Sequence, residues 1–219
     1  MPPVKKQINA CIFDETGERV YNKKNENKKG IFCMQFPFNA LGLSHKWIFE
    51  HVKNGDLCID ATCGKGRDTL FLSKLVGNSG HVFAFDIQKE AIEQTKALLK
   101  SEGCENVTVI WDCHSKLTRY IHRDVAAIMF NFGWLPGGDH NVFSLPETSI
   151  AALRAGLDLL SAGGIITLCI YYGKETGYAE RDALLSYLKT LDQGMYSVLK
   201  AEFVNRKNEP PIAVLIRKE

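Results

Sequence analysis

A short glycine-rich turn, Gly64-Lys-Gly66, lies between an apolar segment and a helical one. Glycines at a strand-to-helix turn let the backbone approach a ligand closely and direct its N–H groups toward that ligand. The turn differs from a dinucleotide-binding loop because Thr69 stands where a third glycine is expected, and from a P-loop because Gly66 directly follows the lysine. Asp60 ends the strand before the turn, where a carboxylate favours a cationic ligand and repels pyrophosphate. The pattern therefore favours the sulfonium methyl donor S-adenosylmethionine over a dinucleotide.

Acidic residues also end the next two expected strands. Asp86 follows the turn by about 20 residues, the spacing at which a carboxylate accepts the ribose hydroxyl protons of a bound nucleoside. The alternative for Asp86 is the N-cap of the next helix. Asp112 ends the third strand in Asp112-Cys-His114, where it can accept a hydrogen bond from the exocyclic amine of an adenine. His114 either lines the same site or is a surface or capping histidine.

The segment Asn131-Phe-Gly-Trp-Leu-Pro-Gly-Gly-Asp139 directly follows a fourth apolar strand. Carboxyl ends of strands in such sheets carry functional residues. Asn131 can accept and orient an amino substrate, Trp134 can stack on a base, and Gly137-Gly138 allows the backbone to approach it. Asp139 can accept a proton or hold the amine. The alternative is a turn-rich connection with a packing tryptophan.

These residues need a sheet that brings strand ends together. Apolar runs predict strands at 56–61, 81–87, 107–111, 125–130, 165–171, 197–205 and 212–218. Helical spacing predicts helices at 43–52 (with Ser44 as its cap), 68–76, 89–101, 146–160 and 178–191, with Ala162-Gly-Gly164 ending the fourth of these. The alternation predicts a parallel sheet, and the last two strands, with no room for a helix between them, should pair antiparallel. The predicted fold is α/β: a Rossmann-like class I methyltransferase with a mainly parallel seven-stranded sheet, helices on both faces and an antiparallel C-terminal hairpin.

Composition fits an ordinary globular protein, with 45% hydrophobic and 24% charged residues among 219. No apolar run approaches the roughly 20 residues that span a bilayer, so no membrane association is expected. The seven cysteines form no C-x-x-C pair, which predicts a reducing cytoplasmic location and no structural metal. A net charge of +2 does not by itself establish nucleic-acid binding. Residues 1–30, rich in lysine, are expected to be an appended hairpin or a solvated mobile arm, preceding one domain at 31–219.

Taken together, the motifs resemble the bacterial "putative rRNA methylase" family, which includes tRNA 5-(aminomethyl)-2-thiouridine methyltransferases. The resemblance covers about residues 40–219, and its most specific part is Leu135-Pro-Gly-Gly-Asp139. Trp134, His140 and Lys174 differ from the family's usual tyrosine, lysine and histidine. The matching motifs are Leu43-Ser-His45, Asp60–Thr69, Ala84–Gln88, Asp112–His114, Asn131–Asp139, Pro146-Glu-Thr148, Ile170-Tyr-Tyr-Gly173, Leu191-Asp-Gln193 and the Asn205–Pro211 loop.

The resemblance implies N-methylation of the aminomethyl group of 5-aminomethyl-(2-thio)uridine at the tRNA wobble position, with S-adenosylmethionine as donor and S-adenosylhomocysteine as product. It implies catalytic roles for Asp139, Asn131 and His45. The implied donor-binding residues are Asp60, Thr62, Gly64, Gly66, Asp68, Thr69, Asp86, Ile87, Gln88, Asp112, His114 and Asn131. The implied substrate-binding residues are Phe132, Gly133, Trp134, Leu135, Pro136, Gly138, Asp139 and Tyr172. The implied partner is the anticodon arm of tRNA, and a homodimer would enlarge the surface that meets it.

Three other functions remain open: an rRNA methyltransferase, a small-molecule amine methyltransferase, and a donor-binding protein without catalysis. The Asn131–Asp139 segment argues against the last, because a binding protein needs no substrate platform. A further motif, Asn208-Glu-Pro-Pro211, is similar to the N-P-P-Y signature of amino-methyltransferases. It lies between the last two strands, so a rigid loop is the preferred interpretation.

Overall fold

The computed structural model describes residues 11–13, 19–21, 36–133 and 145–219. The chain divides into two units, Met1–Gln35 and Phe36–Glu219. In the first unit, β1 (Cys11–Phe13) pairs antiparallel with β2 (Arg19–Tyr21). The lysines of this stretch lie outside the described residues, as does the division predicted at residue 30.

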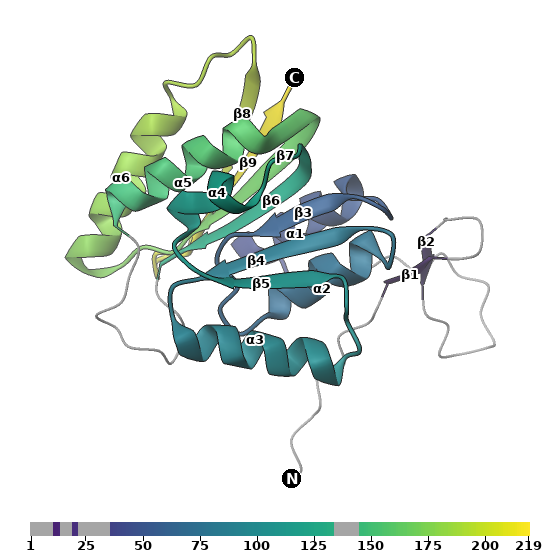
Figure 1. Cartoon of the computed structure of the whole chain (residues 1–219). Helices are drawn as coiled ribbons and strands as arrows, with labels where there is room; N and C mark the ends of the chain where they lie inside the picture. The colour runs from purple at the N-terminus through teal and green to yellow at the C-terminus, as the bar shows by residue number, and fades with distance from the viewer. Residues whose placement is uncertain (1–10, 14–18, 22–35, 134–144) are drawn as a thin grey trace, which may run out of the picture. The chain divides into compact units, whose positions relative to one another are not determined.

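The second unit is built on a seven-stranded sheet in the order β5-β4-β3-β6-β7-β9-β8 (Figure 1). Five neighbouring strands run parallel, and β9 and β8 close the sheet antiparallel, so the predicted fold class is confirmed. The strands are β3 (Leu57–Asp60), β4 (His81–Asp86), β5 (Val107–Trp111), β6 (Val125–Phe132), β7 (Leu160–Ile170), β8 (Tyr196–Ala201) and β9 (Ile212–Lys218).

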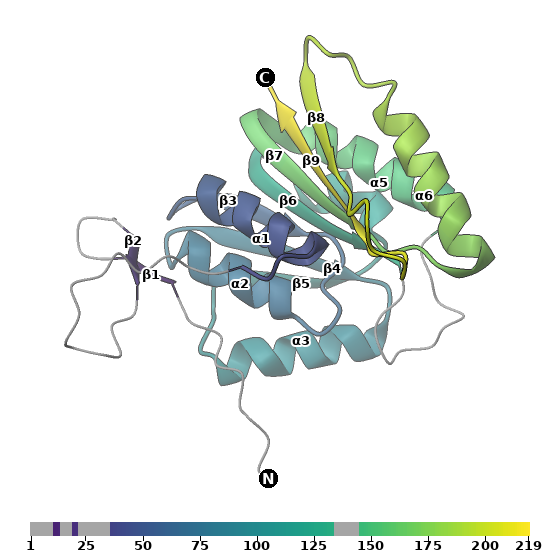
Figure 2. The same cartoon turned by 180° about the vertical axis from the view of Figure 1, so that it is seen from behind.

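Helices cover both faces of this sheet. The helices α1 (Ala40–His51) and α2 (Arg67–Val76) lie on one face, with α3 (Lys89–Ser101) beside α2 (Figure 2). A 3-10 turn at His114–Lys116, α4 (Leu117–Tyr120) and α5 (Pro146–Leu159) lie on the other face, and α6 (Lys174–Leu188) packs against α5.

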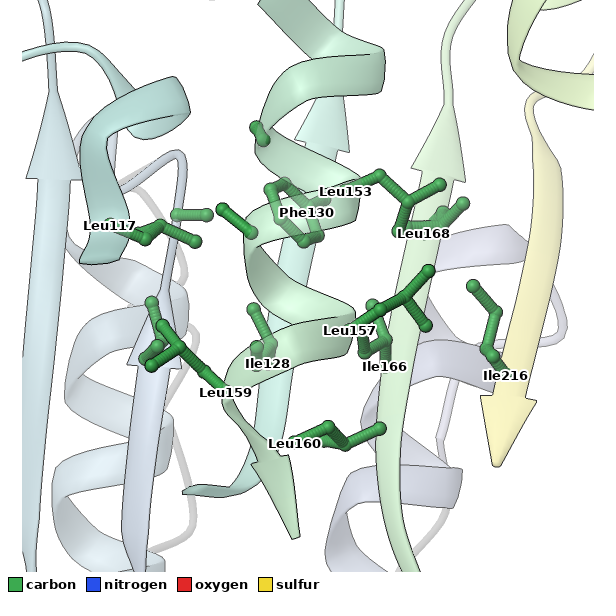
Figure 3. Close-up of a cluster of buried hydrophobic side chains, with 14 of the residues drawn as sticks. Leu117, Ile128, Phe130, Leu153, Leu157, Leu159, Leu160, Ile166, Leu168 and Ile216 are labelled. Atoms are coloured by element: carbon green, nitrogen blue, oxygen red, sulfur yellow. The ribbon is translucent and has the colours of Figure 1, made fainter. Parts of the chain in front are cut away.

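The largest core cluster lies between α5 and the sheet. Leu153 and Leu157 of α5 pack with Ile128, Phe130 and Ile166 of β6 and β7 (Figure 3). Burying each of these side chains stabilises the fold by roughly 1.5–3 kcal/mol. This packing fixes the central strands, and therefore the edge at which the polar residues lie.

Strand order reverses between β3 and β6, which are hydrogen-bonded neighbours although two strands separate them in sequence. The carboxyl ends of β3, β4, β5, β6 and β7 all meet one edge of the sheet, here called the carboxyl edge. In open α/β sheets, ligands bind outside this edge at the point of reversal. Asp60 and Asn131 lie there, at or near the ends of β3 and β6.

Several predicted boundaries differ from the structure. The N-cap of α1 is Asn39, whose Oδ1 accepts a hydrogen bond from Gly42 N at 2.8 Å, whereas Ser44 is buried and donates to Thr167. The helix predicted to end at residue 160 ends at Leu159, but β7 begins at Leu160 and not at residue 165, so Ala162-Gly-Gly164 lies within the strand. The pair Val125–Leu160 is followed by a register shift that accommodates these extra residues. In addition, α6 begins before residue 178, and β8 ends at Ala201.

Candidate active site

The glycine-rich turn leaves β3 and enters α2 in left-handed conformations. Gly64 and Gly66 have φ of 50° and 78°, a region that residues with a Cβ rarely adopt. Thr95 of α3 packs directly behind the turn: a Cβ at Gly66 would lie 2.9 Å from Thr95 Cα and Oγ1. Thr95 Oγ1 also donates to Gly64 O at 3.1 Å. Thr95 was not identified as a site residue from the sequence.

Asp60 holds the two ends of this turn from inside the protein. Its carboxyl is fully buried; one oxygen accepts from Thr69 Oγ1 at 2.6 Å and the other from Thr62 N at 3.2 Å. Burial and the nearby charge of Asp68 raise the pKa of Asp60, while the hydrogen bond from Thr69 opposes that rise. Asp60 therefore faces the protein, and it fixes Thr62 and Thr69 rather than presenting an exposed carboxylate.

Asp86 connects the turn to the end of β4. Its Oδ2 accepts from Gly64 N at 2.9 Å, and its Oδ1 accepts from Gln88 N at 2.9 Å. Burial raises the pKa of Asp86, and these backbone donors oppose the rise. The N-cap of α3 is Gln88, so the capping interpretation of Asp86 is wrong. Beside it, Ile87 presents an apolar side chain that is 49% exposed.

Asp112 and His114 lie beyond the end of β5. Asp112 accepts from Lys116 Nζ at 2.6 Å and from Tyr120 Oη at 2.7 Å, and these bonds lower its pKa to about 2. Burial lowers the pKa of His114 to about 4, against a hydrogen bond to the backbone of Ala61, so its ring is neutral near pH 7. His114 is half-buried, and it lies next to Ala61, the residue that opens the glycine turn.

Asp68 joins two of the predicted catalytic residues. Its Oδ1 lies 2.8 Å from His45 Nε2, and its Oδ2 accepts from Asn131 Nδ2 at 2.8 Å. The ring of His45 stacks on Phe71 with centroids 4.5 Å apart, which fixes its orientation. His45 and Asp68 are 21% and 12% exposed, so the network reaches the surface at the carboxyl edge. Side chains from α1, α2 and β6 thus form one hydrogen-bonded network.

The end of β6 also closes against the glycine turn. Asn131 N donates to Thr62 Oγ1 at 2.8 Å. Gly133 has a φ of 132°, and a Cβ there would lie 2.9 Å from Tyr171 Cβ. Phe132 is fully buried and stacks on Phe130, so its side chain supports the site from beneath and does not reach a substrate. The remaining predicted members of this loop, Trp134, Leu135, Pro136, Gly138 and Asp139, lie outside the described residues.

Tyr172 follows the end of β7 at the same edge. The guanidinium of Arg181 lies 4.8 Å from the centroid of its ring and 5.0 Å from that of Tyr178. An open cleft of about 360 Å³ is found elsewhere, between the end of α3 and the start of β5, with Lys96 and Lys100 among its lining residues. The cleft lies at the opposite edge of the sheet and is not part of this site.

In the described ranges, no group of three or more His, Cys, Asp or Glu side chains is arranged to hold a metal ion. No helix in these ranges is long and apolar enough to cross a bilayer.

Residues 82–217 match the family model described as "Putative rRNA methylase". The chain belongs to this family. A curated relative, the chloroplastic tRNA (mnm5s2U34)-methyltransferase of Arabidopsis thaliana, is 35% identical over 191 residues, covering 82% of this chain and 70% of that protein.

Two solved structures support the same family assignment. A protein from Clostridium thermocellum described as a "putative rRNA-methylase" superposes with a TM-score of 0.82 at 46% identity, covering 86% of this chain and all of that one. A protein from Streptococcus mutans described as a "putative methyltransferase", solved with S-adenosylhomocysteine, has a TM-score of 0.77 and 34% identity, covering 85% of this chain and all of that one. This methylase is an S-adenosylmethionine-dependent methyltransferase, as predicted from its sequence.

Proposed function

We propose that the methylase transfers a methyl group to RNA, and specifically to the exocyclic amine of 5-aminomethyl-(2-thio)uridine at the wobble position of tRNA. The observation that carries this proposal is the His45–Asp68–Asn131 network beside the glycine turn. An amide fixed at the carboxyl edge suits an amine nucleophile, and the Arabidopsis relative is named for this wobble-uridine methylation.

The donor would lie across the carboxyl edge. The turn at Gly64 and Gly66, whose own N–H groups bond to Asp86 and to Cys63 O, lets the backbone approach the donor closely, and we assign the ribose hydroxyls to Asp86. The exposed side chain of Ile87 would contact the adenine, and we assign its exocyclic amine to Asp112, which follows Trp111, whose Nε1 donates to Ile87 O. The donor carries a sulfonium and an ammonium group, and Asp68, which is 12% exposed at the carboxyl edge, would provide the negative charge for them.

Asn131 would orient the nucleophile. Its Nδ2 donates to Asp68, so Oδ1 remains the group of this amide that can accept an N–H from a substrate amine. An alkyl ammonium must first lose a proton; the free amine then attacks the donor methyl in line. A C–N bond forms, the C–S bond breaks, and its electron pair stays on sulfur. The protein chiefly supplies alignment and exclusion of water.

We assign the proton to Asp139 or to the His45–Asp68 pair, with water carrying it to solvent. A carboxylate close to an amine raises the pKa of that amine, so Asp139 must pass the proton on rather than hold it. Replacing Asp139 with Asn should slow turnover while binding of donor and tRNA is kept. Undiminished turnover in that variant would exclude Asp139 from proton transfer.

The decisive experiment is transfer from labelled S-adenosylmethionine to tRNA that lacks the final wobble methyl, followed by nucleoside analysis. We expect label in the methylaminomethyl nucleoside. Absence of product on this tRNA, with product on rRNA, would overturn the substrate assignment in favour of an rRNA enzyme.

The modest net charge of +2 favours one alternative, a small-molecule amine methyltransferase. Turnover of free amines without RNA, together with no salt-dependent RNA affinity, would support that alternative. For the tRNA enzyme, the anticodon arm is the partner, and a homodimer would provide more surface for it. Sedimentation of the protein with and without tRNA tests this assembly.

A further inference from the structure

The connection between β8 and β9 lies at the carboxyl edge, close to the end of β7 (Figure 2). Ile212, the first residue of β9, pairs with Ile170, the last residue of β7, and Cys169 pairs with both Ala213 and Asn131. The segment 202–211 therefore begins three strands away from Asn131, after β8, and ends two strands away, at β9. It belongs to the same edge as the donor turn, although the donor site does not use it.

The start of α1 meets this connection. Ala40 packs with Cys169 and Ala213. Just before it, the carbonyl of Phe38 accepts a hydrogen bond from Arg206 Nη2 at 3.1 Å. Two segments 168 positions apart in sequence are thus joined at the carboxyl edge.

An aromatic and cationic cluster results, formed by Phe38, Phe203 and Arg206. The rings of Phe38 and Phe203 meet edge to face with centroids 5.4 Å apart, and the Arg206 guanidinium lies 3.9 Å from the Phe203 centroid. Phe38 is 75% exposed, and the adjacent Val204 is 98% exposed. The cluster presents an uncovered aromatic ring next to a fixed cation.

The connection is held in place at its far end too. Glu209 has a φ of 47° in the left-handed region, and its carboxylate accepts a hydrogen bond from Tyr178 Oη. A non-glycine residue keeps such a backbone only where surrounding contacts impose it. In this segment Glu202 pairs with Lys200 of β8 and Glu209 bonds to Tyr178, while Arg206 and Lys207 are exposed. The carboxylates thus have partners on the protein, while two cations face solvent.

We propose that Phe38, Phe203 and Arg206 bind an unpaired nucleotide of single-stranded RNA next to the nucleotide that enters the active site. This rests on the proposed RNA substrate and extends it to a subsite. Aromatic faces stack on bases and guanidinium groups contact phosphates, which is the combination that single-stranded RNA sites use. A protein partner would also cover an exposed phenylalanine. The cations beside the rings, at the edge where RNA must bring its reacting base, favour RNA.

The test measures binding of a fluorescein-labelled anticodon stem-loop RNA to the full chain, with S-adenosylhomocysteine affinity measured separately by calorimetry. Phe203→Ala and Arg206→Gln should each raise the RNA Kd by roughly tenfold, the size expected from losing one stacked base. Their affinity for S-adenosylhomocysteine and their melting temperatures should match those of the wild type. Leu199→Ala and Arg123→Gln are matched controls, because Leu199 is 53% exposed on β8 and Arg123 is exposed just before β6, at the opposite edge.

Unchanged RNA affinity in both variants, with a wild type that binds the RNA, would overturn this subsite and leave the proposed function standing; a protein partner would then be the better account. Reduced S-adenosylhomocysteine affinity would also overturn it, because the cluster would then support the donor site. If the wild type fails to methylate wobble uridine but the variants still lose RNA affinity, the subsite holds and only the substrate assignment fails.

Discussion

Asp68 accepts a hydrogen bond from the side chain of Asn131, 63 positions later in the chain, at 2.8 Å. The same carboxylate accepts from His45, so one residue of α2 fixes groups from α1 and β6. Hydrogen bonds to charged groups contribute about 1.5–3 kcal/mol each. Removing the carboxylate should therefore disturb both neighbours at once.

We expect Asp68→Asn to weaken binding of S-adenosylmethionine by about tenfold to a hundredfold, measured by calorimetry. The double variant with Asn131→Ala should lose less than the sum of the two single losses, because both changes break the same bond. Asp158→Asn, at an exposed position on α5, is the control. Strictly additive losses would mean that Asp68 and Asn131 act independently.

Gly66→Ala should reduce the free energy of unfolding by more than Gly103→Ala. Both glycines have positive φ, 78° and 67°, so both variants carry the backbone cost of about 1 kcal/mol. Only at Gly66 would the new Cβ meet Thr95, at 2.9 Å, whereas no atom lies within 4 Å of a Cβ at Gly103. Urea unfolding of the two variants measures the difference. Equal losses would show that α3 does not press on the turn.

Thr69→Val removes the hydroxyl that donates to Asp60 at nearly constant side-chain volume. We expect a loss of about 1–3 kcal/mol of unfolding free energy, because a buried carboxyl loses a hydrogen bond. The bond favours the ionised form, so its loss raises the folded-state pKa of Asp60 further above the unfolded value. Stability from such a raised carboxyl pKa declines as pH rises, so the deficit should be larger near about pH 8 than near about pH 5. The exposed Thr118→Val is the control, and a pH-independent deficit would contradict this role.

His114 should make the fold sensitive to mild acid. Its folded-state pKa of about 4 lies below the ordinary value of 6.5, so the unfolded chain binds the proton first as pH falls. Stability is complete above about pH 6.5 and declines toward pH 4, by about 3 kcal/mol at most. His114→Gln cannot titrate and should lack this part of the decline. Parallel stability curves for the two proteins between these pH values would refute the assignment.

The sheet, its parallel order and the antiparallel C-terminal pair followed from the alternation of apolar runs, because strand and helix periods differ. The acidic strand ends were found for the same reason. Contacts between distant segments were not visible: nothing in the sequence links Thr95 to Gly64, or Arg206 to Phe38. The sequence shows that Asp60 lies beside the turn. The direction of its carboxyl group depends on its hydrogen bond with Thr69, in the first turn of α2, and the sequence does not show that bond. Phe132 shows the same limit, since strand alternation decides which face each residue meets and Phe132 points into the core.

The bond between Asn131 N and Thr62 Oγ1 spans 69 positions, and Ala61 N donates to Met129 O across the same gap. A nascent chain that has been synthesised only through α3 contains the whole glycine turn and Asp86. It still lacks β6, which supplies Asn131 to the proposed donor site. The proposed donor site is complete only when β6 lies beside β3. We therefore expect chains that end before β6 not to bind the methyl donor.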